Sequence, residues 1–402
     1  MQPRMMVTRA VVSFTRLQAS SSVCSKSLPF APRCLRIAQL CHEYPPHTGG
    51  LEVIVREVSE RLAARHDVVV VTAAVGEATG VEHRGRLTIH RLPSIRPIER
   101  FGVPYTVPTG PLLRDACAAV ASCDVVHVHG SIYAQSLIGA RLARARKAPL
   151  FITEHVGWVP YASVMLRAVQ SVAWRSVGQV VLSGATGAIT YNQRVMDWMQ
   201  LQRPALPVES ITNGVDLEQY RPADAAERRG LRDKLGLPSN QVLALTVGRD
   251  VPKKQLGALR SWARRSHTLV TCGSALPSGE GVHALGEVPG ARMPDVYRAC
   301  DFLVHAGVGE GFPLAVQEAM ACGLPPAILW DEAYAAAVRP DAVVPASSLD
   351  ELQRAAELLA TDASARDASG ARARAYAAAE WSWDRTVDRY EAAYVRAGVV
   401  RT

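Results

Sequence analysis

The sequence predicts an α/β protein made of two Rossmann-like, doubly wound domains that face each other across a cleft. Short apolar runs typical of buried parallel strands alternate with helical patterns. The alternation restarts after a stretch at residues 204–222 that contains Pro, Asn and Gly. The 402 residues exceed the usual size of one domain, and 48% hydrophobic with 20% charged residues is an ordinary globular composition.

The first domain is predicted to span residues 34–205. A strand at 35–41, a turn-rich loop, a helix at 51–64 and a strand at 67–73 open it. Further strands are predicted at 87–91, 125–129, 150–153 and 188–190. Helical stretches lie between most of them, which is typical of a parallel sheet covered on both faces.

The second domain is predicted to span residues 206–380. Its short apolar strands are expected at 242–248, 268–273, 282–286, 301–307 and 327–330. An aromatic turn and an amphipathic helix follow at 381–402. In two parallel sheets of this kind, ligands bind where the loops at the carboxyl ends of the strands gather.

Residues 1–33 carry five basic and no acidic residues and are rich in serine, as an organellar transit peptide would be. A start codon assigned too early in a gene rich in Ala and Arg codons would produce the same composition, and we favour that explanation. In both cases we expect these residues to be disordered and to stand outside the fold.

Charge and cysteine usage narrow the function classes. Residues 1–216 hold 23 Lys and Arg against 14 Asp and Glu, whereas residues 217–402 hold 22 against 23. This bias suits anionic lipid headgroups or phosphate-bearing substrates, and equally a solvated basic face. No dense basic run supports nucleic acid. The eight cysteines include no CxxC pair, which favours a reducing compartment, and no uncharged apolar window of about 18 residues predicts a membrane span.

Two carboxylates, Glu310 and Glu318, bracket the stretch EGFPLAVQEAMACGLP. A helix beginning at Pro313 would leave Glu310 on the incoming loop, beside unpaired N–H groups that attract anions. The two carboxylates would accept hydrogen bonds from sugar hydroxyls while the backbone holds a diphosphate. The alternative is the acid and base pair of a glycosidase.

Glycines and cations at two other strand ends fit a phosphate-bearing ligand. Gly49 and Gly50 precede a helix, so backbone free of side chains would approach a phosphate or sugar closely, or would simply form a tight turn. Arg249 and Lys254 follow the first strand of the second domain and would neutralise a departing diphosphate. Lys253 is the alternative to Lys254.

These pieces, in this order and spacing, resemble the family-4 retaining glycosyltransferases, which have the GT-B fold. The resemblance covers residues from about 35 to 395 and rests on HEYPPHTGGLE, TEH, ITNGVD, VGRDVPKK, EGFPLAVQEAMACGLP and WSWDRTVDRY. It implies transfer of a sugar from a nucleoside-diphosphate-sugar to a hydroxyl of a glycan or lipid-linked glycan. The anomeric configuration would be retained, with the leaving phosphate taking the acceptor's proton.

The resemblance also implies a role for individual residues. His155 would contact the transferred sugar, Arg249 and Lys254 the diphosphate, Glu310 the sugar hydroxyls and Glu318 the ribose. The predicted catalytic residues are His155, Arg249, Lys254 and Glu310, and the predicted donor-binding residues are Gly49, Gly50, Gly248, Arg249, Lys254, Glu310, Gly311, Phe312, Leu314 and Glu318. The first domain would hold the acceptor, the second the donor, and the final helix would cross back onto the first domain.

Neither a metal nor a resident cofactor is predicted, because no isolated DxD triplet follows a strand. The acceptor is expected near residues 95–111 and 156–161, where Phe101, Tyr105, Trp158 and Tyr161 offer surfaces for sugars or lipids. With the basic first half, these aromatic residues favour a cytoplasmic enzyme that is peripheral at the inner face of a membrane.

Residues 326–338 depart from the family pattern, since they lack the Gly-Gly turn that the family commonly has there and the glutamate that belongs to that pattern. They motivate the alternative of a non-catalytic nucleotide-sugar-binding protein with the same fold. A dinucleotide-dependent dehydrogenase would instead need GxGxxG after a strand, and the first strand meets HEYPPHTGG.

Overall fold

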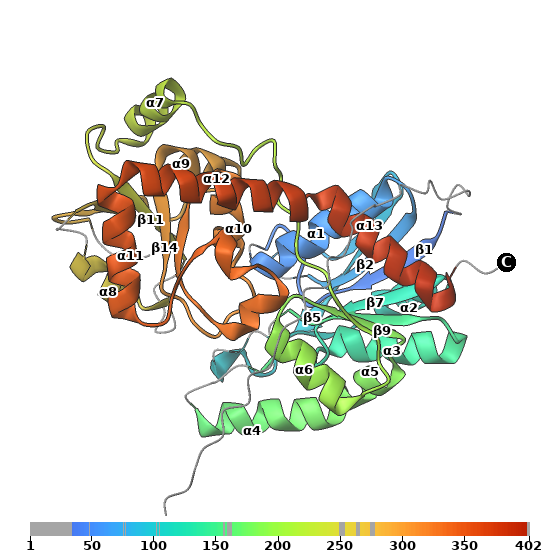
Figure 1. Cartoon of the computed structure of the whole chain (residues 1–402). Coiled ribbons are helices and arrows are strands. Elements are labelled where there is room, and N and C mark those ends of the chain that lie inside the picture. Colours follow the sequence, from blue (N-terminus) through green and yellow to red (C-terminus); the bar gives the residue numbers. More distant parts are fainter. Residues whose placement is uncertain are drawn as a thin grey trace, which may run out of the picture. The chain divides into compact units, whose positions relative to one another are not determined.

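The computed structural model describes residues 34–399 except for 48, 75, 77, 102, 104, 156, 159–162, 249–253, 263–265 and 274–277. The expected leader at residues 1–33 and the predicted site residue Arg249 lie outside the described residues. The described chain contains two mainly parallel sheets with helices on both faces (Figure 1). The predicted α/β class is therefore confirmed.

Within the described residues, the first sheet has eight strands in the order β10-β9-β8-β7-β1-β2-β4-β3. The strands are β1 (Arg36–Leu40), β2 (Asp67–Ala73), β3 (Gly80–Arg84), β4 (Leu87–Leu92), β7 (Val125–His129), β8 (Leu150–Thr153), β9 (Gly187–Thr190) and β10 (Val208–Ser210). Neighbours are parallel except β3 and β4. The predicted bounds of β2, β7 and β8 are confirmed to the residue.

Helices cover both faces of this sheet. They are α1 (Gly50–Ala63), α2 (Leu112–Ala121), α3 (Ala134–Arg146), α4 (Val164–Ala173), α5 (Gln179–Gly184) and α6 (Gln193–Gln202). A π-helical turn (Trp174–Gly178) joins α4 to α5. A small antiparallel pair, β5 (Ser94–Ile95) and β6 (Val107–Pro108), lies between β4 and α2 in the chain.

The valine run of β2 shows why parallel strands read as continuous apolar stretches. Side chains alternate between the two faces of a strand. Val68 and Val70 join the core that contains α1, whereas Val69 and Val71 join the core that contains α2, α3, α5 and α6. Because both faces are covered, every position of the strand favours an apolar residue.

Within the described residues, the second sheet has six parallel strands in the order β13-β12-β11-β14-β15-β16. The strands are β11 (Leu243–Val247), β12 (Thr268–Cys272), β13 (Val282–Ala284), β14 (Phe302–His305), β15 (Pro326–Leu329) and β16 (Val344–Ala346). Its helices are α7 (Ala225–Leu235), α8 (Leu256–Trp262), α9 (Met293–Ala299), α10 (Leu314–Ala321), α11 (Leu349–Thr361) and α12 (Ala363–Glu380).

The connection between the two sheets starts later than the predicted boundary at residues 205 and 206. β10 pairs in parallel with β9, so the first sheet continues to Ser210. This three-residue strand was missed because its sequence, VES, has no apolar run. Beyond it, Val215 N donates to the Trp381 carbonyl at 2.7 Å, which joins the linker to the start of the last helix.

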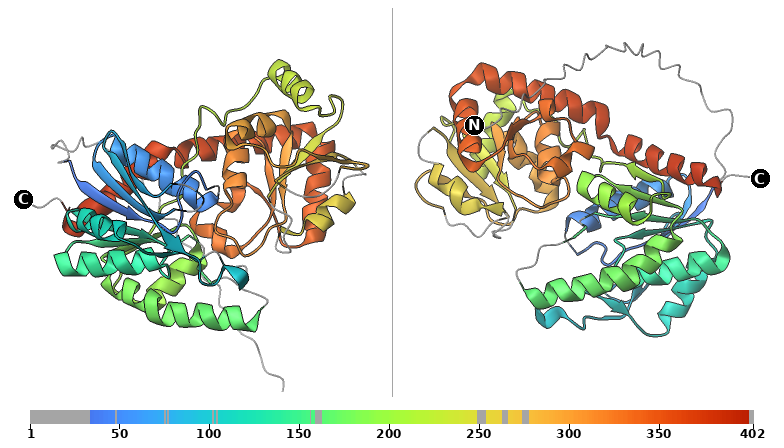
Figure 2. Two further views of the ribbon diagram at one scale, coloured as in Figure 1. Left: turned by 180° about the vertical axis from the view of Figure 1, so that it is seen from behind. Right: turned by 60° about the horizontal axis from the view of Figure 1, so that its bottom comes forward.

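The last helix, α13 (Trp383–Tyr394), packs on the first sheet in the same core as α1 (Figures 1 and 2). Trp383 and Tyr390 are buried there, as expected for packing residues. Gly214 permits the close approach of the linker, because a Cβ at this position would lie 2.6 Å from the Trp383 Cα. No helix in the described part of the chain is long and apolar enough to cross a bilayer.

Helix α10, which carries Glu318, is held in place by α12. Gly370 on α12 approaches the Gly323 carbonyl so closely that a Cβ would lie 2.3 Å from its oxygen. Arg374 on α12 donates to the Ala321 carbonyl at 2.6 Å, at the end of α10. A cation at this place also offsets the negative end of the α10 dipole.

Two helical glycines give a matched test of this packing. We expect Gly370→Ala to lower the free energy of unfolding by about 1–3 kcal/mol, because the new methyl group overlaps the Gly323 carbonyl. Gly230→Ala in α7 meets no atom within 4 Å and should raise it by about 0.5–1 kcal/mol, because alanine favours the helix. Urea denaturation measures both. Equal effects of the two substitutions would contradict the close contact.

Candidate functional site

Loops at the carboxyl ends of β8, β9, β11 and β14 meet at one place. Gln255, which follows β11, donates through Nε2 to the Ala306 carbonyl just after β14, at 2.9 Å. Asn192, which follows β9, donates through Nδ2 to the Glu310 carbonyl at 3.1 Å. Strand ends of both sheets therefore contribute to the same site, as parallel α/β sheets usually do.

Lys254 and Glu310 form a partly buried ion pair at this site. Lys254 Nζ donates to Glu310 Oε2 at 2.8 Å, and His305 Nε2 lies 3.6 Å from the same oxygen. Burial alone would raise the pKa of Glu310, but the hydrogen bond from His305 and the charge of Lys254 hold it down to about 2. Glu310 is therefore an ionised acceptor of hydrogen bonds, unsuited to donate a proton near neutral pH.

Gly248 gives Lys254 its position. This glycine has φ of +144°, which residues with a side chain rarely adopt, and a Cβ here would lie 3.2 Å from Lys254 Cε. The lysine stem thus lies over bare backbone at the end of β11. Lysine has three donor hydrogens, so Lys254 keeps donors for a phosphate while it bonds to Glu310.

Gly311 brings the Glu310 loop against the first domain. A Cβ at this glycine would lie 2.8 Å from the His155 carbonyl oxygen and 3.0 Å from Tyr191 Cε2. The atom of His155 that lies at this junction is its carbonyl oxygen, and the residue is 4% exposed. The predicted residues His155, Lys254, Glu310 and Gly311 are thus brought together.

The His155 ring belongs to a buried chain of polar side chains. Its Nε2 is hydrogen-bonded to His129 Nδ1 at 3.2 Å and its Nδ1 to Tyr191 OH at 3.3 Å. His129 Nε2 continues to Gln39 Oε1 at 2.7 Å. Burial lowers the pKa of His155 to about 4, so the ring is neutral near pH 7 and does not act as a fixed cation. This series of hydrogen-bonded side chains was not predicted, because single polar residues inside strands form no recognisable sequence pattern.

Glu318 has different surroundings from Glu310. Tyr297 OH donates to Glu318 Oε2 at 2.7 Å. Burial raises the pKa of Glu318 to about 7, although hydrogen bonds from Tyr297 and Tyr220 oppose this shift. Neither tyrosine was predicted, since Tyr297 lies on α9, which has an ordinary core pattern, and Tyr220 lies in a turn of the segment that joins the two sheets. The expected contact of Glu318 with a ribose stays a prediction.

The other predicted donor residues lie around the start of α10. Pro313 is the N-cap residue rather than the first helical residue, and no side chain of the described residues caps this end. Phe312 is buried, with its ring centroid 5.5 Å from those of Tyr334 and Trp381, so only its backbone faces the loop side. Leu314 Cδ1 would lie 3.6 Å from a Cβ on Gly50, which joins the starts of α10 and α1.

Gly49 lies beneath a carboxylate. A Cβ here would lie 2.2 Å from Glu52 Oε2, so an anion approaching Gly49 meets the Glu52 charge. His47 Nδ1 lies 3.3 Å from Glu52 and 3.2 Å from Glu43, and Arg96 donates to Glu43 at 2.7 Å. The glutamates and His47 could offer ligand atoms to a cation, all within 4.8 Å of one another. Arg96 already neutralises part of the group, and the absence of a metal remains a prediction.

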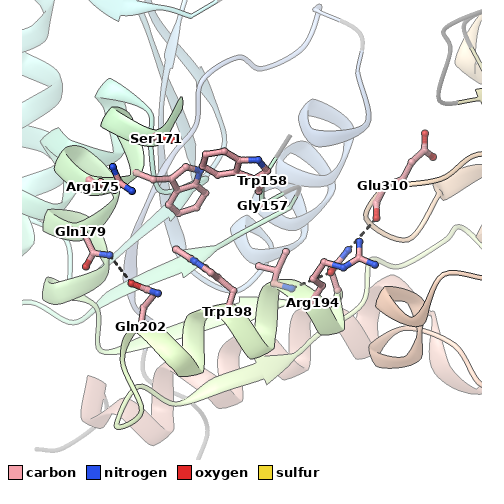
Figure 3. Close-up of a pocket in the computed structure, with 13 residues that line it drawn as sticks. Gly157, Trp158, Ser171, Arg175, Gln179, Arg194, Trp198, Gln202 and Glu310 are labelled. Atoms are coloured by element: carbon pink, nitrogen blue, oxygen red, sulfur yellow. Dashed lines mark hydrogen bonds between the residues drawn. The ribbon is translucent and has the colours of Figure 1, made fainter. Parts of the chain in front are cut away.

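Two cavities adjoin the site on the first domain. One, of about 610 Å³, extends from Glu310 past Trp158 and Trp198 to Gln179 and Gln202 (Figure 3). The second, of about 350 Å³, includes His155 and the predicted acceptor residue Tyr105. Trp174 lines both cavities. It was not predicted as a site residue, because a tryptophan in an amphipathic helical pattern is usually a core residue. Tyr161 and the side chain of Phe101 lie outside the described residues.

The raised pKa of Glu318 predicts a dependence of stability on pH. Between about pH 4.5 and 7 the folded protein keeps a proton that the unfolded chain releases, so this group's contribution to stability falls as pH rises. The free energy of unfolding of Glu318→Gln should equal that of wild type below this pH window. Above pH 7 it should exceed that of wild type by about 1–3 kcal/mol. Urea denaturation from pH 4.5 to 8.5 measures this. The exposed Glu287→Gln is the control, and a Glu318→Gln curve parallel to wild type would contradict the expectation.

Comparisons with known proteins match both halves of the chain. The model of Glycosyltransferase Family 4 matches residues 48–219, and that of Glycosyl transferases group 1 matches residues 227–376. The D-inositol 3-phosphate glycosyltransferase of Mycobacterium leprae (strain Br4923) is 30% identical over 336 residues, which is 73% of this chain and 75% of that protein.

A more distant relative is the phosphatidylinositol N-acetylglucosaminyltransferase GPI3 subunit of Saccharomyces cerevisiae (strain YJM789). It is 24% identical over 316 residues, covering 72% of this chain and 66% of that subunit, just under two thirds of its length. Among solved structures, Anabaena HepE in complex with UDP has a TM-score of 0.72 at 17% identity, covering 90% of this chain and 100% of that one. The chain therefore belongs to the family-4 glycosyltransferases and has their two-domain GT-B fold.

Proposed function

We propose that this glycosyltransferase moves a sugar from a nucleoside-diphosphate-sugar to a hydroxyl of a glycan or lipid-linked glycan, with retention and without a metal. The observation that carries the proposal is the Lys254–Glu310 pair, held against the His155 carbonyl by Gly311. A cation, an ionised carboxylate and a carbonyl oxygen at one place suit a diphosphate, sugar hydroxyls and a positively charged anomeric carbon.

Each group has a role in the proposed reaction. The bond between the anomeric carbon and the diphosphate oxygen breaks, and its electron pair leaves with the phosphate. Lys254, together with Arg249, which lies outside the described residues, offsets that growing charge. The acceptor oxygen attacks from the same face and passes its proton to the leaving phosphate. Glu310 aligns the sugar through its hydroxyls, and the His155 carbonyl oxygen stabilises positive charge on the ring.

The donor half of the proposal has support from relatives. The solved HepE structure contains UDP, and the yeast relative is named as an N-acetylglucosaminyltransferase. UDP and UDP-sugars are therefore the first donors to test. Their binding should stabilise the fold by mass action, which thermal melting measures directly.

We also propose that the protein is cytoplasmic and associates peripherally with the inner face of a membrane. The net positive charge of residues 1–216 suits anionic lipid headgroups. On α4, Val164, Met165 and Val172 are at least half exposed, although they are apolar. Arg167 lies between them in sequence and Arg175 follows them, the composition of a surface that meets lipids. An acceptor linked to lipid would be reached from this position.

Replacing the paired cation tests the donor site. We expect Lys254→Met to lower kcat/KM for the preferred donor by about 10²- to 10³-fold, because charge on the leaving diphosphate is no longer offset. Lys234→Met, which removes an exposed lysine paired with Asp295, should stay within about twofold of wild type. Proton NMR of the product should show the anomeric configuration of the donor.

The alternative, a non-catalytic nucleotide-sugar-binding protein, makes a different prediction. It requires that the protein binds the donor but neither transfers the sugar nor hydrolyses the donor in the presence of membrane extracts. It also requires that Glu310→Ala leaves this behaviour unchanged. That result would overturn the transferase proposal. An inverted product would leave transfer intact but overturn retention.

A further inference from the structure

The smaller cavity lies between α4 and the loop that joins β5 to β6. Its walls are mostly apolar, with Leu166, Val169 and Ala173 from α4 and Trp174 from the π-helical turn on one side, and Ile98 and Val103 from the loop on the other. Glu154 and His155 close the end that lies beside the donor site. The volume of about 350 Å³ falls in the range of small-molecule sites, about 300–1,000 Å³.

Tyr105, Glu154 and His155, which line this cavity, already have hydrogen-bond partners within the protein, whereas Trp174 Nε1 has none among the described residues. Tyr105 OH donates to the Ile132 carbonyl at 2.9 Å. Glu154 Oε2 accepts hydrogen bonds from Ser131 N at 2.9 Å and from Ser131 Oγ at 2.8 Å. Both ring nitrogens of His155 are hydrogen-bonded as well. A hydroxylated occupant would lose its bonds to water here and gain few in return, whereas an apolar one would gain from burial.

The cavity is continuous with the outer apolar face of α4. Val169 lines the cavity and is also 44% exposed, so the wall at this residue reaches the surface. There it adjoins Val172, which is 65% exposed, and Met165, which is 50% exposed. An apolar chain can therefore pass from the surface of α4 into the cavity without crossing a charged rim on this helix face.

We propose that the acceptor is amphiphilic: its alkyl part occupies this cavity, and its reacting hydroxyl lies at the His155 end. The inference rests on the proposed glycosyl transfer and names its acceptor class. It separates this chain's acceptor from a small, wholly polar one, for which the mostly apolar walls offer few hydrogen-bond partners. The larger cavity shares Gly157 and Trp174 with this one and leads from the reacting end to Glu310.

Isothermal titration with n-alkyl β-D-glucopyranosides below their micelle concentrations tests the proposal, with methyl, hexyl and octyl glucosides as probes. For wild type we expect affinity to rise roughly three- to fourfold per added methylene, from about 0.8 kcal/mol per buried CH2. Ala173→Phe fills the cavity and should abolish this rise. Ala168→Phe makes the same change on an exposed position of α4 and should preserve it.

A second variant covers the case in which Ala173→Phe does not fold. Leu166→Ala enlarges the cavity and should shift the steepest gain in affinity to longer chains, such as decyl. An affinity of wild type that does not depend on alkyl chain length would overturn the inference. An unchanged rise of affinity with chain length in Ala173→Phe would also overturn it, because the alkyl chain would then lie outside the cavity. Stabilisation by UDP, measured on the same samples, reports on the donor site alone, so its absence would count against the proposed function instead.

Discussion

The close approach of Gly311 to the His155 carbonyl is the constraint on which the site depends. Any side chain at residue 311 would collide with that oxygen and with Tyr191. Because residue 311 has none, the Glu310 loop can lie on the ends of β8 and β9, and Asn192 after β9 donates to the Glu310 carbonyl. Groups from two sheets then lie at one place, although no single domain contains them all.

Two carboxylates from one motif acquire opposite properties in this arrangement. His305 and Lys254 hold the pKa of Glu310 down to about 2, whereas burial raises the pKa of Glu318 to about 7 despite its hydrogen bonds from two tyrosines. A charged group suits the recognition of sugar hydroxyls beside a diphosphate. A carboxyl that takes up a proton near neutral pH can both donate and accept, which suits a ribose diol. Neither needs to exchange a proton with the reacting atoms.

The sequence predicted the sheets better than the contacts within the site. Strands covered on both faces are continuous apolar runs, so β2, β7 and β8 were located to the residue, and the meeting of strand ends followed from the parallel order. The short polar strand β10 gave no such signal. The partners of charged groups were hidden too, because Lys254 reaches Glu310 across 56 residues. The apolar cavity beside α4 was invisible for a related reason, since an amphipathic helix has the same pattern whether it faces a core or a ligand.

Titration of UDP into Gly311→Ala most directly tests whether one donor site spans both domains. Gly230→Ala, which adds the same methyl group where no atom lies within 4 Å, is the control, and thermal melting verifies that both variants fold. We expect at least tenfold weaker UDP binding for Gly311→Ala, because the methyl group pushes the Glu310 loop off the His155 carbonyl. For Gly230→Ala we expect unchanged UDP binding. Wild-type affinity in a folded Gly311→Ala protein would contradict the expected weakening.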